Sequence, residues 1–275
     1  MPAPPPAQAT SDGATYTAVA TWTAGIVGGA LLGYVAWRSR PGSPNPIDWS
    51  LRGPGGFYVG GFTGASFVPR SDWHYSPDQQ APLPYSVTAQ SVRWSASMLG
   101  GLKVGYFFHK FPYLGLDGEF NYTRNSIPEQ NVTLKPPLPN TNRIPGSLAR
   151  VPSQNLSIFT FALHIVGRYG FLKDEEVPFG RLQPYVGIGP GFSIIYGEVD
   201  AAKNFGIDTM AGVRIMFRKN LSGFVEYKFN HQFDVELEHS KLKQLSGVGP
   251  YEQRGLATFD FTMHQILVGL CFHFL

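Results

Sequence analysis

The C-terminal seventeen residues constrain the fold of this 275-residue chain more than any other segment. Every second residue from 266 to 274 is large and apolar. The odd-numbered positions from 265 onward include four residues that are small or polar: Gln265, Gly269, Cys271 and His273. Side chains on a strand alternate between its faces, so the pattern predicts a strand with one apolar and one mixed face. Its length exceeds the roughly 5–6 residues of a typical soluble strand and fits the roughly 9–11 with which a tilted strand crosses a bilayer. We therefore predict a strand of a membrane β-barrel.

Seven further segments show strand patterns separated by turn signals. They are residues 56–67, 91–108, 113–124, 155–171, 184–197, 205–218 and 221–235, and the C-terminal strand follows at 259–275. Long polar or Pro-rich connections fall at 70–90, 125–153 and 236–257, whereas short links fall near 109–112 and 219–220. Long outer loops and short inner turns are typical of membrane barrels, and only the short segment 199–204 departs from that pattern. The prediction is all-β: an eight-stranded antiparallel up-and-down transmembrane β-barrel over residues 56–275.

The N-terminal region divides into three parts. Residues 1–15 are rich in Pro and Ala, and we expect them to be disordered. Residues 16–37 carry no charge and are long enough for a membrane helix, and 38–55 form a Pro/Gly linker. The apolar segment could be a signal peptide, a retained helix or the product of a start codon placed too far upstream. As a retained helix it could dock to a membrane-complex partner, because Gly29 and Gly33 allow close helix approach. We favour an export or anchor segment.

Composition excludes several classes of protein. The mean hydropathy of −0.09 is too low for a helical membrane protein. It is expected for a membrane β-barrel, because apolar and polar residues alternate along its strands and their hydropathies average out. The net charge of +3 is too small to indicate a nucleic-acid partner, and no basic cluster interleaved with aromatics occurs. A single cysteine, Cys271, excludes an internal disulfide, and we interpret it as a small apolar filler inside the barrel.

Charged residues on the predicted strands fall on the face opposite the apolar one. A Lys or Arg facing lipid at the bilayer midplane costs about 2–4 kcal/mol, so the charged face must point inward. An eight-stranded barrel is only just wide enough for its interior side chains, so these charges must pair. We predict a lumen charge network formed by Lys103, Asp117, Glu119, His164, Arg168, Asp208, Arg214, Glu226 and Lys228. Its four Lys and Arg residues balance its four carboxylates and plug the lumen; the alternative is a gated ion path. Gly187, Gly189 and Gly191 point inward and leave room for large neighbours.

Seven segments together resemble the small outer-membrane β-barrel family that includes the OmpA transmembrane domain. They are GFYVGGFTGASF, KVGYFF, YLGLDGEFNY, PYVGIGPGF, GVRIMF, FVEYKF and ILVGLCFHF. The resemblance implies the bacterial outer membrane, contact with its lipid and lipopolysaccharide, and insertion by the barrel-assembly machinery. The chain departs from the family in ending on Leu275 after Phe274, which suggests weaker recognition by that machinery. No peptidoglycan-binding domain follows the barrel, so anchoring to the cell wall is not expected.

The resemblance also includes barrels that modify lipid A, and His231 in the segment FNHQF is the nearest candidate for such chemistry. Lipid A deacylases carry a Ser two residues after the catalytic His, whereas this chain has Phe233 there. No base is evident within reach of a Ser nucleophile, and the seven histidines lack metal-ligand spacing. We therefore expect a structural or surface-interaction protein with no catalytic residues, metal or cofactor. A small-solute or ion pore is the alternative, and a lipid A-modifying enzyme is less favoured.

Overall fold

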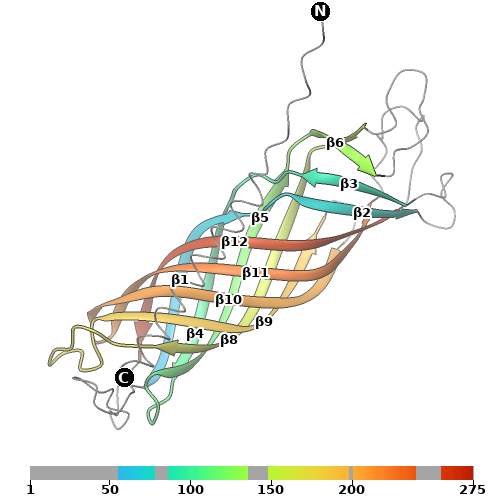
Figure 1. Cartoon of the computed structure of the whole chain (residues 1–275). Coiled ribbons are helices and arrows are strands. Elements are labelled where there is room, and N and C mark those ends of the chain that lie inside the picture. The colour runs from blue at the N-terminus through green and yellow to red at the C-terminus, as the bar shows by residue number, and fades with distance from the viewer. Residues whose placement is uncertain (1–54, 78–85, 136–147, 198–200, 240–254, 275) are drawn as a thin grey trace, which may run out of the picture.

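The computed structural model describes residues 55–77, 86–135, 148–197, 201–239 and 255–274. Eight of its strands form a closed antiparallel ring (Figure 1). In ring order they are β1 (Gly56–Phe67), β4 (Ser97–Phe107), β5 (Leu114–Ile127), β8 (Gln154–Arg168), β9 (Leu182–Tyr196), β10 (Ala201–Arg218), β11 (Leu221–His239) and β12 (Gly255–His273). Ten residue pairs between β1 and β12, from Tyr58–His273 to Phe67–His264, close the ring. The predicted eight-stranded barrel is confirmed.

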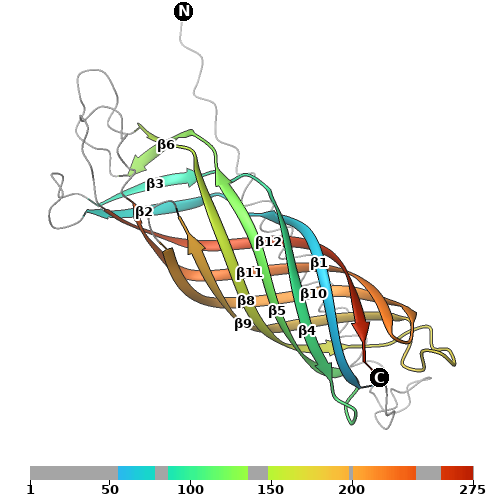
Figure 2. The same cartoon turned by 180° about the vertical axis from the view of Figure 1, so that it is seen from behind.

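Four short strands extend the sheet beyond the ring, in segments that the sequence patterns assigned mainly to loops. They are β2 (Ser71–Pro77), β3 (Val87–Val92), β6 (Gln130–Lys135) and β7 (Leu148–Val151). They continue from the N-terminal part of β12 in the order β2, β3, β6, β7, and Figure 2 shows them at the end where β5 and β8 project. The expected strand 91–108 therefore corresponds to two strands, because β3 ends at Val92 and β4 begins at Ser97. Likewise, β11 and β12 extend into the expected loop 236–257.

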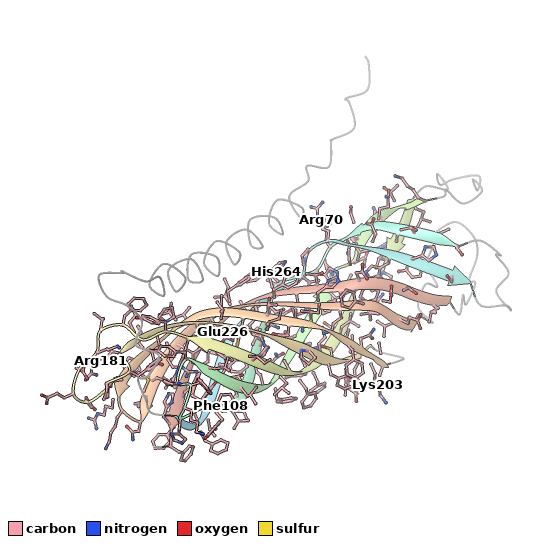
Figure 3. All side chains as sticks on the ribbon, turned by 60° about the horizontal axis from the view of Figure 1, so that its bottom comes forward. Arg70, Phe108, Arg181, Lys203, Glu226 and His264 are labelled. Carbon is pink, nitrogen blue, oxygen red and sulfur yellow. The ribbon has the colours of Figure 1, made fainter. Side chains whose placement is uncertain are left out.

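The two ends of the barrel differ. Residues 108–113, 169–181 and 219–220 connect strands at one end, which we call the short-turn end. Residues 172–181, which we call the cap, fold inward there, so that Val177 and Phe179 are buried. Arg181 holds the cap in place: its guanidinium bonds Asp174 and Glu176 and donates to the backbone oxygen of Phe217 at 2.9 Å. Figure 3 shows Arg181 and Phe108 at this end, with Glu226 midway along the barrel.

The opposite, long-loop end encloses an apolar core. Trp73 stacks on Phe259 with ring centroids 4.4 Å apart, and both side chains are buried. Residues from the extension and from the ring surround this pair, among them Val87, Ala89, Ile127, Val132, Leu134, Leu156, Ile158, Ile195, Leu237 and Phe261. The inner face of the sheet is therefore apolar at this end, whereas around Glu226 it is charged.

The outer face of the ring carries the exposed apolar side chains that the alternation predicted. On β12 these are Ile266, Val268, Leu270 and Phe272, whereas Gln265, Cys271 and His273 point inward and are buried. No helix in the described ranges is long and apolar enough to cross a membrane. The segments expected at 1–15, 16–37 and 38–55 lie outside the described residues, except for Gly55.

Candidate functional site

All nine residues of the predicted charge network have buried side chains inside the ring. They come from five strands, β4, β5, β8, β10 and β11, and each occupies an inward position of its strand. Gly187 and Gly191 also face the lumen. A Cβ at Gly187 would lie 2.6 Å from Met210 Cε, and one at Gly191 would lie 3.1 Å from Asn230 Nδ2. The missing side chains therefore leave space for large neighbours.

Two lysines connect three of the four carboxylates. Lys103 Nζ lies 2.8 Å from Glu226 Oε2 and 3.4 Å from Glu119 Oε2. Lys228 Nζ lies 2.6 Å from Glu119 Oε1 and 3.2 Å from Asp208 Oδ1. Each lysine thus bridges two carboxylates, and Glu119 is shared by both. Charge-assisted bonds of this kind satisfy groups that are expensive to leave unpaired away from water.

His164 joins the fourth carboxylate to the others. Its Nε2 lies 2.8 Å from Asp208 Oδ1, and its Nδ1 lies 3.7 Å from Asp117 Oδ1. Tyr58 donates its hydroxyl to Asp117, and Asn230 donates to Asp208 Oδ2 at 2.9 Å. Seven predicted residues, with these polar neighbours, therefore form one connected network across the lumen.

The two arginines are placed differently from the prediction. Neither Arg168 nor Arg214 forms an ion pair with any of the four network carboxylates. The Arg214 guanidinium lies 4.4 Å from the centre of the Tyr58 ring, and that of Arg168 lies 3.4 Å from the centre of the Phe107 ring. Alternation identifies the face of a strand but not the height of a residue along the barrel. Arg168 follows His164 by four residues, about 13 Å along a strand, and this separates it from the carboxylates.

Arg168 is held within this second, aromatic layer by its own hydrogen bonds. It donates to the Pro112 backbone oxygen at 2.9 Å and to Gln183 Oε1 at 3.0 Å. Phe179 of the cap lies on its other side, with 4.4 Å between guanidinium and ring centre. Arginine stacks well on aromatic faces because its charge is delocalised and weakly hydrated. An arginine–aromatic layer therefore separates the ionic network from the short-turn end.

Sequence reasoning missed the tyrosines that complete the network. Tyr185 donates to Glu226 Oε2 at 2.7 Å, and the Tyr58 hydroxyl bonds Asp117 as described above. Both lie at inward positions of strands that carry no lumen charge, β1 and β9. A tyrosine at an inward position opposite charged strands needs a partner for its hydroxyl, and that rule could have identified them.

The remaining candidates show no reactive arrangement. His231 Nδ1 lies 2.8 Å from Thr262 Oγ1, and its ring packs edge-on against Phe233. Cys271 is buried at an inward position of β12. Across the described parts of the chain, no three His, Cys, Asp or Glu side chains are grouped so that they could hold a metal ion.

Comparison with solved structures finds outer-membrane barrels. OprG from Pseudomonas aeruginosa is 12% identical, with 82% of this chain and 100% of that chain covered and a TM-score of 0.47. Neisserial surface protein A is 12% identical, with 80% and 99% covered and a TM-score of 0.45. The outer membrane protease OmpT from Escherichia coli is 7% identical, with 79% and 97% covered and a TM-score of 0.40. Curated protein sequences give no match. Nothing here is positive evidence for an enzyme.

The family itself is shown by the sequence. The model of the outer membrane protein beta-barrel domain matches residues 52–274, which includes all twelve strands. The closed ring of eight strands and the apolar outer face agree with that match. This chain therefore belongs to the outer membrane protein beta-barrel domain family and is a protein of the bacterial outer membrane.

Proposed function

We propose that this protein is a barrel with a structural or surface-interaction role, and that side chains plug its lumen. The observation that carries this proposal is the succession of three buried layers along the barrel: apolar core, ionic network and arginine–aromatic layer. Short turns of outer-membrane barrels face the periplasm, so the short-turn end is periplasmic and the long-loop end extracellular. The apolar core is then the outermost layer.

The apolar core supports a plug because buried apolar side chains make up most of it. Trp73, Phe261 and Met263 are at most 1% exposed, although they lie inside the ring or its extension. Interiors pack as densely as organic crystals, and apolar space without polar partners stays dry. A conducting path would have to displace these side chains.

The ionic network supports the same proposal. Glu119 pairs with both Lys103 and Lys228, and these lysines also pair with Glu226 and Asp208, so each buried ammonium has carboxylate partners. The Lys228 side chain is completely buried. A charged group that lines a water-filled channel keeps its hydration and needs no such partner. Opening the lumen would separate the pairs, and a buried charge without its partner is expensive.

The sheet extension supports a role outside the membrane. Strands β2, β3, β6 and β7 carry the barrel wall beyond the ring, and their inner faces pack against the core around Trp73. In the sequence, segment 78–85 connects β2 to β3 and segment 136–147 connects β6 to β7. Barrels usually carry recognition on such connections. We propose that these segments contact external surfaces or ligands. Outer-membrane lipid, lipopolysaccharide and the barrel-assembly machinery are proposed partners, as is a membrane complex for residues 16–37.

Conductance of the full-length protein in planar bilayers tests the plug. Folded protein, identified by its faster gel migration before boiling, should show no single-channel steps. The matched positive control is Trp73→Ser combined with Lys228→Ser and Arg214→Ser, which removes one side chain from each layer. Steady conductance of the folded wild type would overturn the plugged lumen. Surface interaction is tested separately by comparing the adhesion of cells that express wild type with cells that express a variant with 136–147 replaced by a Gly/Ser segment.

A further inference from the structure

The outer wall of the barrel carries two exposed cations near its long-loop end, Arg124 on β5 and Lys203 on β10. Figure 3 shows Lys203 at the end of the barrel opposite Arg181. Within the described part of the chain, neither cation forms an ion pair with a carboxylate. A cation on the outer face is costly at the bilayer midplane and tolerated near the interface. The two cations therefore mark the height at which this wall leaves the hydrocarbon.

Strand pairing places the two cations in adjacent rows of outward side chains. One row runs from Tyr122 through Phe159 to Lys203, and the next runs from Arg124 through Ser157 to Tyr196. We call these six residues the outer platform. From β5 to β10 there are three strand spacings, so the two cations lie about 14 Å apart across the strands and about 7 Å apart along them.

Aromatic rings and hydroxyl groups fill the space between the cations. The Phe159 ring packs against Tyr122, with 4.9 Å between centroids, and edge-on against Tyr196, with 5.8 Å. The hydroxyl oxygens of Tyr122 and Ser157 lie 3.4 Å apart. Tyrosine presents an apolar ring and a polar tip, which suits a membrane interface. Such a surface matches a sugar, whose C–H groups pack on rings and whose hydroxyls form hydrogen bonds.

The wall between the outer platform and the short-turn end is apolar. Its exposed side chains on β8, β9 and β10 include Leu163, Ile188 and Ile207. They lie where the acyl chains of a lipid would extend from a headgroup held on the outer platform. The wall therefore offers, in order, sites for phosphate, sugar and hydrocarbon.

The cationic sector of the wall ends at β10. Asn204, next to Lys203, donates to the backbone oxygens of Phe233 and Asp234 at 3.0 and 3.1 Å. Asp234 on β11 and Asp260 on β12 are exposed. The wall is thus cationic from β5 to β10 and acidic over β11 and β12. An anionic headgroup is attracted to the first sector and repelled by the second.

We propose that the outer platform binds one bisphosphorylated saccharolipid of the outer leaflet, the lipid A part of lipopolysaccharide. One phosphate lies at Arg124 and the other at Lys203, because guanidinium and ammonium groups bind phosphate with charge-assisted hydrogen bonds. The sugars between the phosphates lie on Phe159 and the two tyrosines. This inference rests on the proposed contact with lipopolysaccharide and is independent of whether the lumen is plugged.

Native mass spectrometry of the folded, full-length protein tests the site. The protein is titrated with lipid A, its monophosphoryl form and its phosphate-free form. Wild type should bind one molecule, about fivefold more weakly for each phosphate removed. Arg124→Gln and Lys203→Gln should each weaken the binding of lipid A about fivefold, and the double variant about 25-fold if the two contacts are independent. Lys135→Gln is the matched control, because Lys135 is an exposed cation of β6 outside the two rows.

The phosphate count separates a site from general attraction to charge. In each single variant the preference of wild type for two phosphates over one should be lost, because one phosphate no longer has a cation. An equal loss in Lys135→Gln would overturn the proposal. Undiminished binding by the double variant would overturn this site while leaving the contact with lipopolysaccharide in place. No binding by the wild type would overturn both. Faster gel migration before boiling confirms that each variant is folded.

Discussion

Lys228 Nζ on β11 lies 2.6 Å from Glu119 Oε1 on β5, although 109 residues separate them in sequence. The two strands are not neighbours in the ring, so this ion pair spans the lumen. Both side chains are buried, and each also contacts a second network member, Asp208 for Lys228 and Lys103 for Glu119. The network therefore connects opposite walls of the barrel that share no backbone hydrogen bonds.

Replacing Lys228 with Met should destabilise the barrel strongly. The change leaves Glu119 and Asp208 buried with fewer cations, and breaking a buried pair from one side costs about 3–5 kcal/mol. Urea unfolding of protein refolded into lipid vesicles, followed by gel migration without boiling, measures the loss. Lys203→Met is the control, because Lys203 is an exposed residue of β10. The double variant Lys228→Met/Glu119→Gln should recover part of the stability, and no recovery would contradict the pairing.

The sequence is sufficient to predict on which face of its strand each charged residue lies. It is not sufficient to predict the position of that residue along the barrel axis. The sequence predicts that Asp117 and His164 point inward, because a charge that faces lipid is energetically costly. The two residues are direct partners on the neighbouring strands β5 and β8. Arg168 and Arg214 also lie inward, but their guanidinium groups stack on the rings of Phe107 and Tyr58 and do not join the ion pairs of the network. Their height depends on strand register, which is set by contacts between residues far apart in the chain. Alternation within one strand does not contain that information.

The same limit explains the missed strands of the extension. In β6, Val132 and Leu134 point inward and Asn131 and Thr133 outward, which is a strand pattern only six residues long. Its Asn residue and the Pro residues that follow are also typical of loops, so local preference was ambiguous. Strand β6 forms because it pairs with β3 and β7 and packs on the core around Trp73. These contacts are tertiary, so no short window of sequence shows them.

A methyl group at Gly105 should destabilise the barrel, whereas one at Gly118 should be tolerated. A Cβ at Gly105 would lie 2.3 Å from Cζ of the buried Tyr58 ring, which bonds Asp117. At Gly118, on the lipid face, the nearest atom is 3.7 Å away. Overpacking of this kind costs about 1–3 kcal/mol. In the same urea unfolding assay, Gly105→Ala should have a lower unfolding midpoint than Gly118→Ala. Equal midpoints would show that the Tyr58 ring can move aside.

Trp73→Ala should remove a central side chain of the apolar core at the long-loop end. Trp73 is completely buried and stacked on Phe259, and truncation of such an aromatic costs about 3–5 kcal/mol. Because Trp73 lies in the extension, the loss should be concentrated there. Hydrogen exchange should quicken in β2 and β3 more than at the centre of β10. Trp73→Phe is the control, since it keeps a ring against Phe259. Uniform quickening along the whole chain would show that extension and ring unfold as one unit.

The cap should lose its Arg181 contacts in acid. Hydrogen bonds from Arg181 hold the pKa values of Asp174 and Glu176 below their usual values of 3.8 and 4.5. Both folded pKa values are lowered, so the contribution of these groups is complete above the unfolded pKa values and is lost as pH falls through the folded ones. NMR titration of the two carboxyl groups in lipid nanodiscs, from about pH 6 to about pH 2, measures this directly. Arg181→Gln should raise both pKa values, whereas Lys173→Gln, which changes a residue without these contacts, should leave them as they are. Unchanged titration in Arg181→Gln would show that the guanidinium does not hold the cap.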